Sequence, residues 1–252
     1  MAYLRSSRTR AREYAPRHRA TATAVARCSS FDVGRRSTPE DARRRRSFAD
    51  VVRRTADFFV AVVLLGLFSG PMLVIAIAVW CGDRGPALFR QERVGLGRNQ
   101  FTMLKFRTMT VGVGDDMLRD LIGRELRGEV TAVNGSSKLS NDRRVTRVGA
   151  FLRRTSLDEL PQLINVLRGE MALVGPRPCL EWEAEMFPAE YAPRFNVRPG
   201  LTGLWQVSGR STLGTLDMLR LDVHYVRTRS LLTDTRILLR TVPTLLRSDG
   251  AR

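Results

Sequence analysis

The sequence predicts a helix-dominated α+β fold that is monotopic at a membrane, with a re-entrant helix-break-helix and a small β-hairpin. Three observations predict it: an uncharged apolar segment over residues 58–82, two short apolar runs around a glycine-rich turn near residue 97, and later segments with apolar residues at helical spacing. We therefore divide the 252 residues into a disordered basic tail (1–47), a membrane hairpin (48–82) and a cytosol-facing domain (83–252).

The tail and the overall composition indicate an anionic partner. Residues 1–47 are rich in arginine, serine and threonine, which predicts disorder. The chain has 42 basic and 25 acidic residues, a net charge of +17, so nucleic acid, acidic lipid and a phosphorylated substrate are all candidate partners. We interpret the tail as solvated, with an electrostatic tether to anionic lipid as the alternative. Three widely spaced cysteines and two histidines argue against a disulfide framework, a zinc site and a histidine-based active site.

The apolar segment Phe58–Gly82 has the length of a transmembrane helix, and length alone favours a single span. Two features favour a re-entrant hairpin instead. Gly70 and Pro71 lie at the midpoint, where a proline kinks or breaks a helix. Arginines flank both ends, and because positively charged residues stay on the cytoplasmic side, a single span would satisfy only one flank. We predict that the chain turns at Gly70 and Pro71 and leaves the membrane on the face where it entered.

The remaining elements follow from periodicity and turn residues. Two apolar runs within Pro86–Met109 predict a β-hairpin around Gly95–Asn99. Ser156 and Glu159 form a capping-box pattern, which predicts a helix that begins at Ser156 and ends near Arg168. A polar loop is predicted at Asn134–Ser140, and further helices are predicted at Asp115–Arg127, Glu181–Glu185, Leu216–Tyr225 and Leu231–Leu246. The last of these helices could lie on a membrane face.

The adjacent carboxylates Asp158 and Glu159 are the strongest candidates for chemistry. Carboxylates beside the cations of Arg153 and Arg154 suit reactions on a phosphate, with one group as nucleophile or metal ligand and the cations neutralising charge. The alternative is structural: Glu159 caps a helix and Asp158 complements its dipole, and the residues alone leave the two interpretations even. In the catalytic case we expect the helix N-terminus and the arginines to keep Asp158 ionised.

Three other segments carry cations or rigid turns. Lys105 and Arg107 alternate on a predicted strand and would share one face. The turn Pro176–Pro178 restricts the backbone of Arg177, which suits a preorganised phosphate contact. The loop Arg198–Arg210 has polar groups between glycines and could face a substrate. Each has a structural alternative, namely a solvated strand face, a connecting loop or ordinary turns.

Eight short blocks occur in the order typical of one family. Together they resemble the bacterial sugar transferase family, the monotopic polyprenyl-phosphate phosphoglycosyl transferases, over roughly residues 53–242. The blocks are Arg53–Asp57, Phe89–Gly95, Lys105–Met109, Asn141–Arg144, Ser156–Gln162, Val174–Pro178, Arg198–Gly203 and Trp205–Gly209. The four-helix membrane domain of larger members has no counterpart in the sequence, so the resemblance is to the minimal catalytic form.

The resemblance implies a fold, an activity and a location. Members transfer a sugar 1-phosphate from a UDP-sugar to a membrane polyprenyl phosphate, such as undecaprenyl phosphate, and release UMP. This is the first membrane step in the assembly of exopolysaccharide, capsule, O-antigen or another glycan. The expected cofactor is magnesium, and the expected partners are the UDP-sugar, the polyprenyl phosphate and membrane lipid, with a homodimer as a further possibility and no nucleic acid. The expected location of the catalytic domain is the cytoplasmic face of the bacterial inner membrane.

The resemblance also implies residue roles. Asp158 would be the nucleophile of a covalent phosphosugar-enzyme intermediate and a magnesium ligand, and Glu159 would be linked to the metal and to activation of the acceptor. By matching position and by charge, the substrate-phosphate contacts would be Lys105, Arg107, Arg153, Arg154 and Arg177. The turn and loop residues on the nucleotide side would be Pro176, Pro178, Arg198 and Arg210.

Two departures and one competing class qualify this hypothesis. The family's membrane break is usually Ser-Pro, whereas Gly70 precedes Pro71 here; glycine also permits a sharp bend. The family's Gly-Asp-Met-Ser is Gly169–Ala172 here, with glutamate for aspartate and alanine for serine, which questions local capping or metal support. A basic, membrane-anchored protein that binds nucleic acid would explain the charge, but neither the carboxylate pair nor the proline turn.

Overall fold

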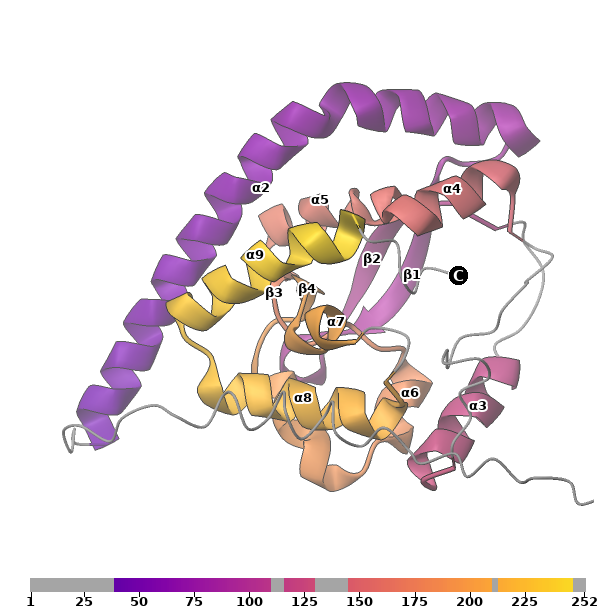
Figure 1. Cartoon of the computed structure of the whole chain (residues 1–252). Coiled ribbons are helices and arrows are strands. Elements are labelled where there is room, and N and C mark those ends of the chain that lie inside the picture. The colour runs from indigo at the N-terminus through magenta and orange to yellow at the C-terminus, as the bar shows by residue number, and fades with distance from the viewer. Residues whose placement is uncertain (1–38, 110–115, 130–144, 210–212, 247–252) are drawn as a thin grey trace, which may run out of the picture. The chain divides into compact units, whose positions relative to one another are not determined.

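The computed structural model describes residues 39–109, 116–129, 145–209 and 213–246 (Figure 1). Most of the predicted tail, the predicted loop Asn134–Ser140 and Arg210 lie outside these ranges. Helices dominate the described residues, together with two small sheets, which confirms the predicted fold class.

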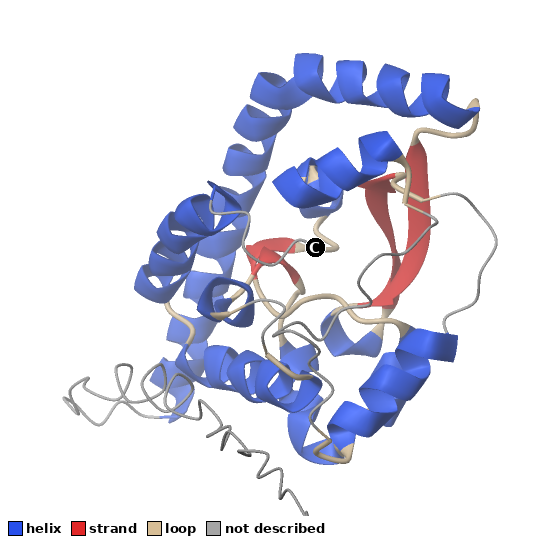
Figure 2. Cartoon of the chain, turned by 45° about the vertical axis from the view of Figure 1, so that its right-hand side comes forward, coloured by secondary structure: helices blue, strands red, loops and turns tan. Residues whose placement is uncertain are grey.

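The membrane segment is a single helix, α2, which runs from Pro39 to Asp83 with Pro71 inside it. The predicted break in helical structure at Gly70 and Pro71 is therefore wrong, because the helix continues through both residues, whereas the expectation that the chain leaves the membrane on the face where it entered stays a prediction. The ribbon of α2 nevertheless changes direction along its length in both views (Figures 1 and 2). Pro71 has no amide hydrogen to donate, and the Ser69 hydroxyl donates to the Gly66 carbonyl at 2.8 Å. Both features bend helices without ending them.

Helix α2 presents most of its apolar surface outward. Within the described residues, it is the one helix long and apolar enough to cross a membrane, over Phe48–Gly82, and only 6% of its most apolar window is buried in protein. Ala61 and Val79 are exceptions, because they are buried against the rest of the fold. The helix begins within the region predicted as tail, so it is longer than the apolar segment itself.

The predicted β-hairpin is confirmed. Strands β1 (Leu88–Val94) and β2 (Gln100–Phe106) pair antiparallel, with Leu88 opposite Phe106. The short 3-10 turn η1 (Leu96–Arg98) joins them, and Gly97 within it has φ 64°, a left-handed conformation that glycine adopts without strain.

Helices supply most of the rest of the fold after the hairpin. Four predicted helices are confirmed with small shifts of their ends: α3 (Asp116–Leu126), α6 (Glu181–Met186), α8 (Thr215–Thr228) and α9 (Leu231–Leu246). The sequence analysis did not predict α4 (Arg147–Thr155), α7 (Leu204–Ser208) or the 3-10 helix η3 (Ala189–Asn196). It also missed a parallel pair of three-residue strands, β3 (Ala172–Val174) and β4 (Gly200–Thr202).

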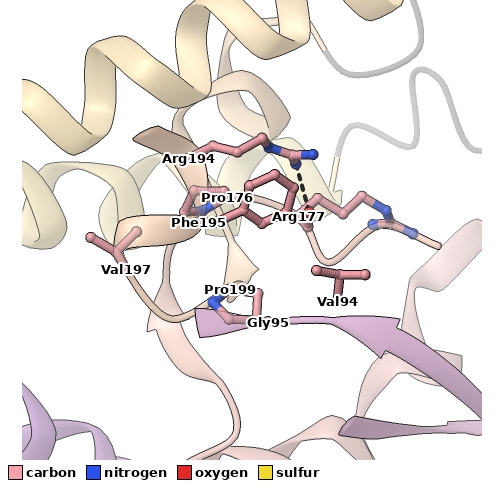
Figure 3. A pocket seen from close by; sticks show the side chains of 8 residues that line it. All are labelled: Val94, Gly95, Pro176, Arg177, Arg194, Phe195, Val197 and Pro199. Atoms are coloured by element: carbon pink, nitrogen blue, oxygen red, sulfur yellow. Dashed lines mark hydrogen bonds between the residues drawn. The ribbon is translucent and has the colours of Figure 1, made fainter. Parts of the chain in front are cut away.

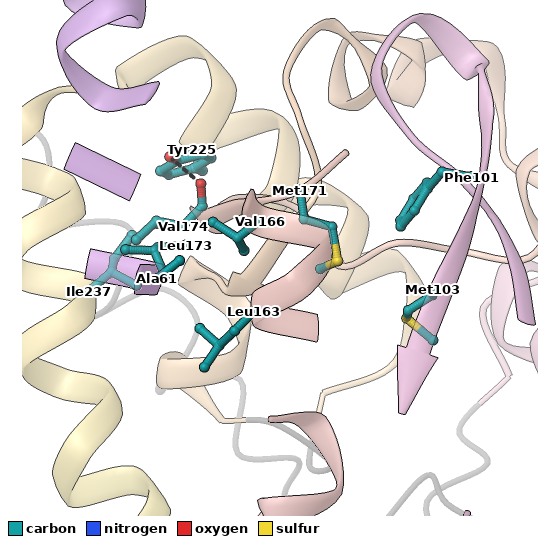
Figure 4. Close-up of a cluster of buried hydrophobic side chains, with 10 residues drawn as sticks. All are labelled: Ala61, Phe101, Met103, Leu163, Val166, Met171, Leu173, Val174, Tyr225 and Ile237. Atoms are coloured by element: carbon teal, nitrogen blue, oxygen red, sulfur yellow. Dashed lines mark hydrogen bonds between the residues drawn. The ribbon is translucent and has the colours of Figure 1, made fainter. Parts of the chain in front are cut away.

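One core joins α2 to the elements that follow it. Leu163 and Val166 of helix α5 (Gln162–Arg168) are fully buried and pack with Ala61 of α2 and Ile237 of α9 (Figure 4). Farther along α2, Val79 packs with other side chains of β2 and α4. Both parts of α2 therefore lie against the domain that carries the candidate site.

Candidate active site

The candidate carboxylates lie in a one-turn 3-10 helix, η2 (Leu157–Glu159), between α4 and α5. The predicted capping box is wrong. Ser156 has φ 57° and ends α4, its side chain caps nothing, and α5 begins only at Gln162, after Pro161. Glu159 is therefore free of a capping role, and its carboxylate contacts cations from two other elements.

Glu159 is the centre of an ion-pair triad. Its Oε1 accepts hydrogen bonds from Lys105 Nζ at 3.1 Å and from Arg177 Nη2 at 3.3 Å. Lys105 comes from β2 and Arg177 from the turn after β3, so three separate segments meet here. The side chains of Lys105 and Glu159 are only 16% and 20% exposed, whereas that of Arg177 is 38% exposed. Each cation uses one N–H on Glu159 and retains others for a ligand.

Charge and burial act in opposite directions on this triad. Burial raises the pKa of Glu159, but Lys105 and Arg177 together lower it further, so that the pKa is about 2. Burial lowers the pKa of Lys105, as does the charge of Arg177, while Glu159 opposes both. Glu159 is thus ionised at neutral pH, and it is a weak base.

Asp158 differs from its neighbour. It is buried, with 8% of its surface exposed, and no hydrogen-bond donor within the described residues reaches its carboxylate. Burial, followed by the charge of Glu159, raises the pKa of Asp158, against the lowering effect of Lys105, Arg177 and Arg153. Burial and Glu159 therefore outweigh the nearby cations in their effect on the pKa of Asp158, and the expectation that Asp158 stays ionised remains a prediction. The carboxylate is more basic than an exposed aspartate and uncommitted to any donor, which suits a nucleophile.

A rigid turn presents Arg177. The Gly175 amide donates to the Thr202 carbonyl at 2.9 Å, and the Gly200 amide donates to the Pro176 carbonyl at 2.8 Å. A Cβ atom on Gly175 or Gly200 would collide with the facing backbone, so only glycine allows this close approach. Pro176 and its turn are consequently held on β4.

A fully buried amide positions Lys105. Asn165 of α5 accepts from the Leu104 amide at 3.0 Å and donates to the Thr102 carbonyl at 2.8 Å. These two bonds fix β2 against α5, the helix that follows Asp158 and Glu159. Asn165 also donates to Glu170 Oε2 at 2.6 Å. The glutamate that departs from the family pattern therefore supports Asn165. The sequence analysis did not identify Asn165.

Two other predicted phosphate contacts, Arg153 and Arg154, make contacts away from the carboxylates of Asp158 and Glu159. Arg153 is exposed and lies 3.3 Å from the Met109 sulfur, although its charge still acts on Asp158. The Arg154 guanidinium lies 6.0 Å from the ring of Phe151 on the surface of α4.

Two more predicted residues contact other parts of the fold. The guanidinium of Arg107 packs against Gly85, just beyond α2. Arg198 donates from Nε to the Gly169 carbonyl at 2.8 Å, at the end of α5. Pro176 and Pro178 are buried on either side of Arg177, and whether any of these residues contacts a nucleotide stays a prediction.

Arg198 instead lines a cavity of about 300 Å³ between α2, β3 and α9. Beside it is a second ionic group, here called the anchor cluster, which consists of Asp50, Arg53, Tyr225, Arg229 and Asp234. Arg53 donates to Asp50 at 3.0 Å and to Asp234 at 2.8 Å, Tyr225 donates to Asp234 at 2.8 Å, and Arg229 pairs with Asp50. The cluster joins the start of α2 to α8 and α9.

The donor set limits how a metal could bind. Among the described residues, no group of three or more histidine, cysteine, aspartate or glutamate side chains is arranged to hold a metal ion. Glu159 already binds two cations, which leaves Asp158 as the available carboxylate. Magnesium is commonly held by one or two carboxylates together with substrate phosphates, and Asp158 fits that mode.

Comparisons with known proteins point to one family. Residues 48–248 match the family described as bacterial sugar transferase. The exopolysaccharide production protein ExoY of Rhizobium meliloti is 40% identical over 215 residues, which cover 84% of this chain and 93% of that protein. A UDP-glucose:undecaprenyl-phosphate glucose-1-phosphate transferase of Caulobacter vibrioides is 44% identical over 211 residues, covering 80% of this chain and 72% of that protein.

A third relative is considerably longer. The UDP-galactose-lipid carrier transferase of Erwinia amylovora is 43% identical over 204 residues, which cover 79% of this chain but only 41% of that protein. The chain thus spans about two fifths of this relative's length.

Proposed function

Because this chain belongs to the bacterial sugar transferase family, we propose that it transfers a sugar 1-phosphate from a UDP-sugar to a membrane polyprenyl phosphate and releases UMP. One observation carries the proposal: Asp158 is a buried carboxylate that no hydrogen-bond donor among the described residues reaches, next to an ion-pair triad that holds two cations. The names of the relatives from Caulobacter and Erwinia support a UDP-sugar donor and a lipid acceptor.

In the first step, an Asp158 carboxylate oxygen attacks the phosphorus that carries the sugar. The bond from that phosphorus to the bridging oxygen breaks, and UMP leaves with the electron pair. The product is a phosphosugar joined to Asp158 as an acyl phosphate. The free N–H groups of Lys105 and Arg177 neutralise the charge that develops on the phosphoryl oxygens.

In the second step, an oxygen of the polyprenyl phosphate attacks the same phosphorus and releases the Asp158 carboxylate. The acceptor phosphate is already anionic and needs little help from a base. A pKa of about 2 makes Glu159 unsuitable as that base at neutral pH, so we assign Glu159 the role of holding Lys105 and Arg177 in place.

Magnesium is part of this proposal. Asp158 and the donor's phosphates would hold it, and the bound ion would supply charge neutralisation at the diphosphate. Lys105 and Arg177 orient the phosphoryl group from the protein side.

The proposed location is the cytoplasmic face of the membrane, at the first membrane step of polysaccharide assembly. The UDP-sugar is soluble, whereas the acceptor phosphate lies at the interface. An outward-facing apolar helix that packs on the same domain as Asp158 would bring the two substrates together.

The test is UMP release by detergent-purified protein with magnesium, polyprenyl phosphate and a panel of UDP-sugars that includes the glucose and galactose forms. We expect release with at least one donor, and a loss of more than about 10³-fold in Asp158→Asn. Because burial and Glu159 raise the pKa of Asp158, the asparagine variant should fold at least as well as the wild type.

A matched control is Glu129→Gln, which removes an exposed carboxylate that pairs with Arg124 at 2.8 Å and Arg127 at 3.2 Å. Its UMP release should equal that of the wild type. Absence of release with every donor, or full activity in Asp158→Asn, would contradict the proposal.

A further inference from the structure

We propose that Arg194, held by Asp222, is a positioning residue that sets the direction of Arg177 and so completes the triad on Glu159. The inference rests on the proposed function, in which Arg177 contacts the transferred phosphoryl group. Neither Arg194 nor Asp222 belongs to a motif that the sequence analysis linked to the site.

Arg194 and Asp222 form a fully buried ion pair. Arg194 Nη2 lies 2.9 Å from Asp222 Oδ2, and the two side chains are 2% and 1% exposed. Arg194 belongs to η3 and Asp222 to α8. Taking two charges out of water costs several kcal/mol per ion, so a buried pair is weak evidence for stability and calls for another reason.

The surroundings of Arg194 fix its position closely. Its guanidinium lies 4.9 Å from the ring centre of Phe187 and 5.4 Å from that of Phe195. The neighbouring cavity measures only about 10 Å³ (Figure 3), which is room for about one water molecule. Nε and Nη1 of Arg194 have no hydrogen-bond partner within the described residues. The pair thus retains donors without a partner, so complete hydrogen bonding does not explain it. What distinguishes the pair is that Arg194 is tightly enclosed and makes one further hydrogen bond.

That further bond goes to the active-site turn. Arg194 Nη2 also donates to the Arg177 carbonyl at 2.8 Å, and Figure 3 shows this bond while the Arg177 side chain extends away from the cavity. The neighbouring prolines, Pro176 and Pro178, restrict the turn on both sides. Holding the carbonyl oxygen removes most of the remaining backbone freedom at Arg177, and therefore sets the direction of its side chain.

The direction of the Arg177 side chain depends on its backbone, because packing around the side chain restrains it only weakly. The Arg177 side chain is 38% exposed, yet its Nη2 lies 3.3 Å from Glu159 Oε1. A half-exposed arginine has many rotamers, so without a fixed backbone it would spend less time on Glu159. An error of about 1 Å in the position of such a group can reduce a rate by about 10²-fold.

The alternative is that the pair only joins η3 to α8. A double-mutant cycle separates the two roles. Arg194 Nη2 makes both bonds, to Asp222 and to the Arg177 carbonyl, and the planar guanidinium is held there against the rings of Phe187 and Phe195. Arg194→Lys retains a charge for Asp222, but its shorter side chain lacks that planar group, so its ammonium is not held where it reaches the Arg177 carbonyl as well. We expect it to lower kcat for UMP release by about 10-fold with little change in KM. In an Arg177→Ala background, the same substitution should change kcat by less than about 2-fold, because the group that it positions is already absent.

The matched control is Thr215→Val, also on α8. It removes a buried hydroxyl that donates to Glu125 at 2.5 Å and has no contact with Arg194. It should lower the midpoint of thermal unfolding about as much as Arg194→Lys, yet leave kcat unchanged. An equal loss of kcat from Arg194→Lys in both Arg177 backgrounds would overturn the proposal and leave the transferase function intact.

A second readout does not require activity. Hydrogen exchange of the peptide over residues 173–179 should be faster in Arg194→Lys and in Asp222→Asn than in the wild type, and unchanged in Thr215→Val. Unaltered exchange in the first two variants would overturn the proposal. If the wild type released no UMP with any donor, the proposed function would fail, and the exchange experiment would still decide whether Arg194 holds the turn.

Discussion

The anchor cluster and the site are ionic groups of similar composition, and within the described residues they differ in how completely they are paired. In the anchor cluster, Asp50 is bound by two arginines, and Asp234 is bound by Arg53 and Tyr225. In the site, Glu159 receives the hydrogen bonds of both Lys105 and Arg177, whereas Asp158 receives none from the part of the chain that the structure describes. The first arrangement holds a helix in place, whereas the second leaves one carboxylate available to react. The number of donors on each carboxylate therefore separates the two groups better than their charge does.

The largest effect that would test this contrast is on activity. Lys105→Met removes a cation that both stabilises Glu159 and would neutralise the transferred phosphoryl group. We expect UMP release to fall by about 10³-fold. The measurement is kcat with the preferred donor. A fall of less than about 3-fold would mean that Lys105 has a structural role, like the arginines of the anchor cluster, and does not act on the phosphoryl group.

The next effect is on stability and its pH dependence. The pKa of Glu159 is about 2 in the folded protein and 4.5 in a model peptide, so the pairing stabilises the fold above about pH 4.5 and is lost as the pH falls towards 2. Glu159→Gln should lower stability at neutral pH by about 2–3 kcal/mol.

The difference between Glu159→Gln and the wild type should also shrink steadily below pH 4.5. Thermal unfolding in detergent at several pH values measures both effects. A constant difference across this range would mean that the triad contributes nothing through the charge of Glu159.

A smaller effect is expected in the anchor cluster. Asp234→Asn weakens the bonds from Arg53 and Tyr225 and should cost about 1–2 kcal/mol of stability. The kcat of the folded fraction should stay within about 2-fold of the wild type, because Asp234 has no contact with the triad. Thermal unfolding and UMP release on one preparation test both statements. A large fall in kcat without a loss of stability would show that the two clusters are not independent.

The smallest expected signal is the absence of labelling at Cys81, near the end of α2, where the thiol is exposed. The anchor cluster and the site lie on one domain that contacts both parts of α2, so both ends of the helix should face the cytoplasm. In a Cys28→Ser background, a membrane-impermeant maleimide added to spheroplasts should leave Cys81 unmodified and should react after lysis. Labelling before lysis would favour a single span.

Long periodic segments and the family blocks could be predicted from sequence. The β-hairpin and helices α3, α8 and α9 have enough residues to show their period. Strands β3 and β4 have three residues each, which is too short for a pattern, and their pairing depends on glycines that lie far apart in the chain. Asp158 and Glu159 were identified, but their environments were not, because burial and distant cations set them.

Two errors have the same physical origin. The Ser156-to-Glu159 pattern satisfies a capping box, but a left-handed Ser156 and contacts to Lys105 and Arg177 override it. Gly70 and Pro71 satisfy a helix break, yet α2 remains continuous. In both cases a local pattern is compatible with more than one backbone conformation. Tertiary contacts determine the conformation at Ser156, and the rest of the helix determines it at Gly70 and Pro71. Arg194 and Asp222 had no local pattern at all, since 28 residues separate them.

The burial of Ala61 and Val79 makes the bilayer a participant in folding. These residues complete clusters that contain Leu163 of α5 and Leu152 of α4, while the opposite surface of α2 is apolar and uncovered. In water the chain would have to either expose that surface or withdraw the helix and open its own core. We therefore expect that removing α2 would not release a soluble enzyme, because the helix completes the hydrophobic core of the domain that carries the site and also anchors it to the membrane. Lipid composition should accordingly influence how well the two clusters are assembled, and not only where the protein resides.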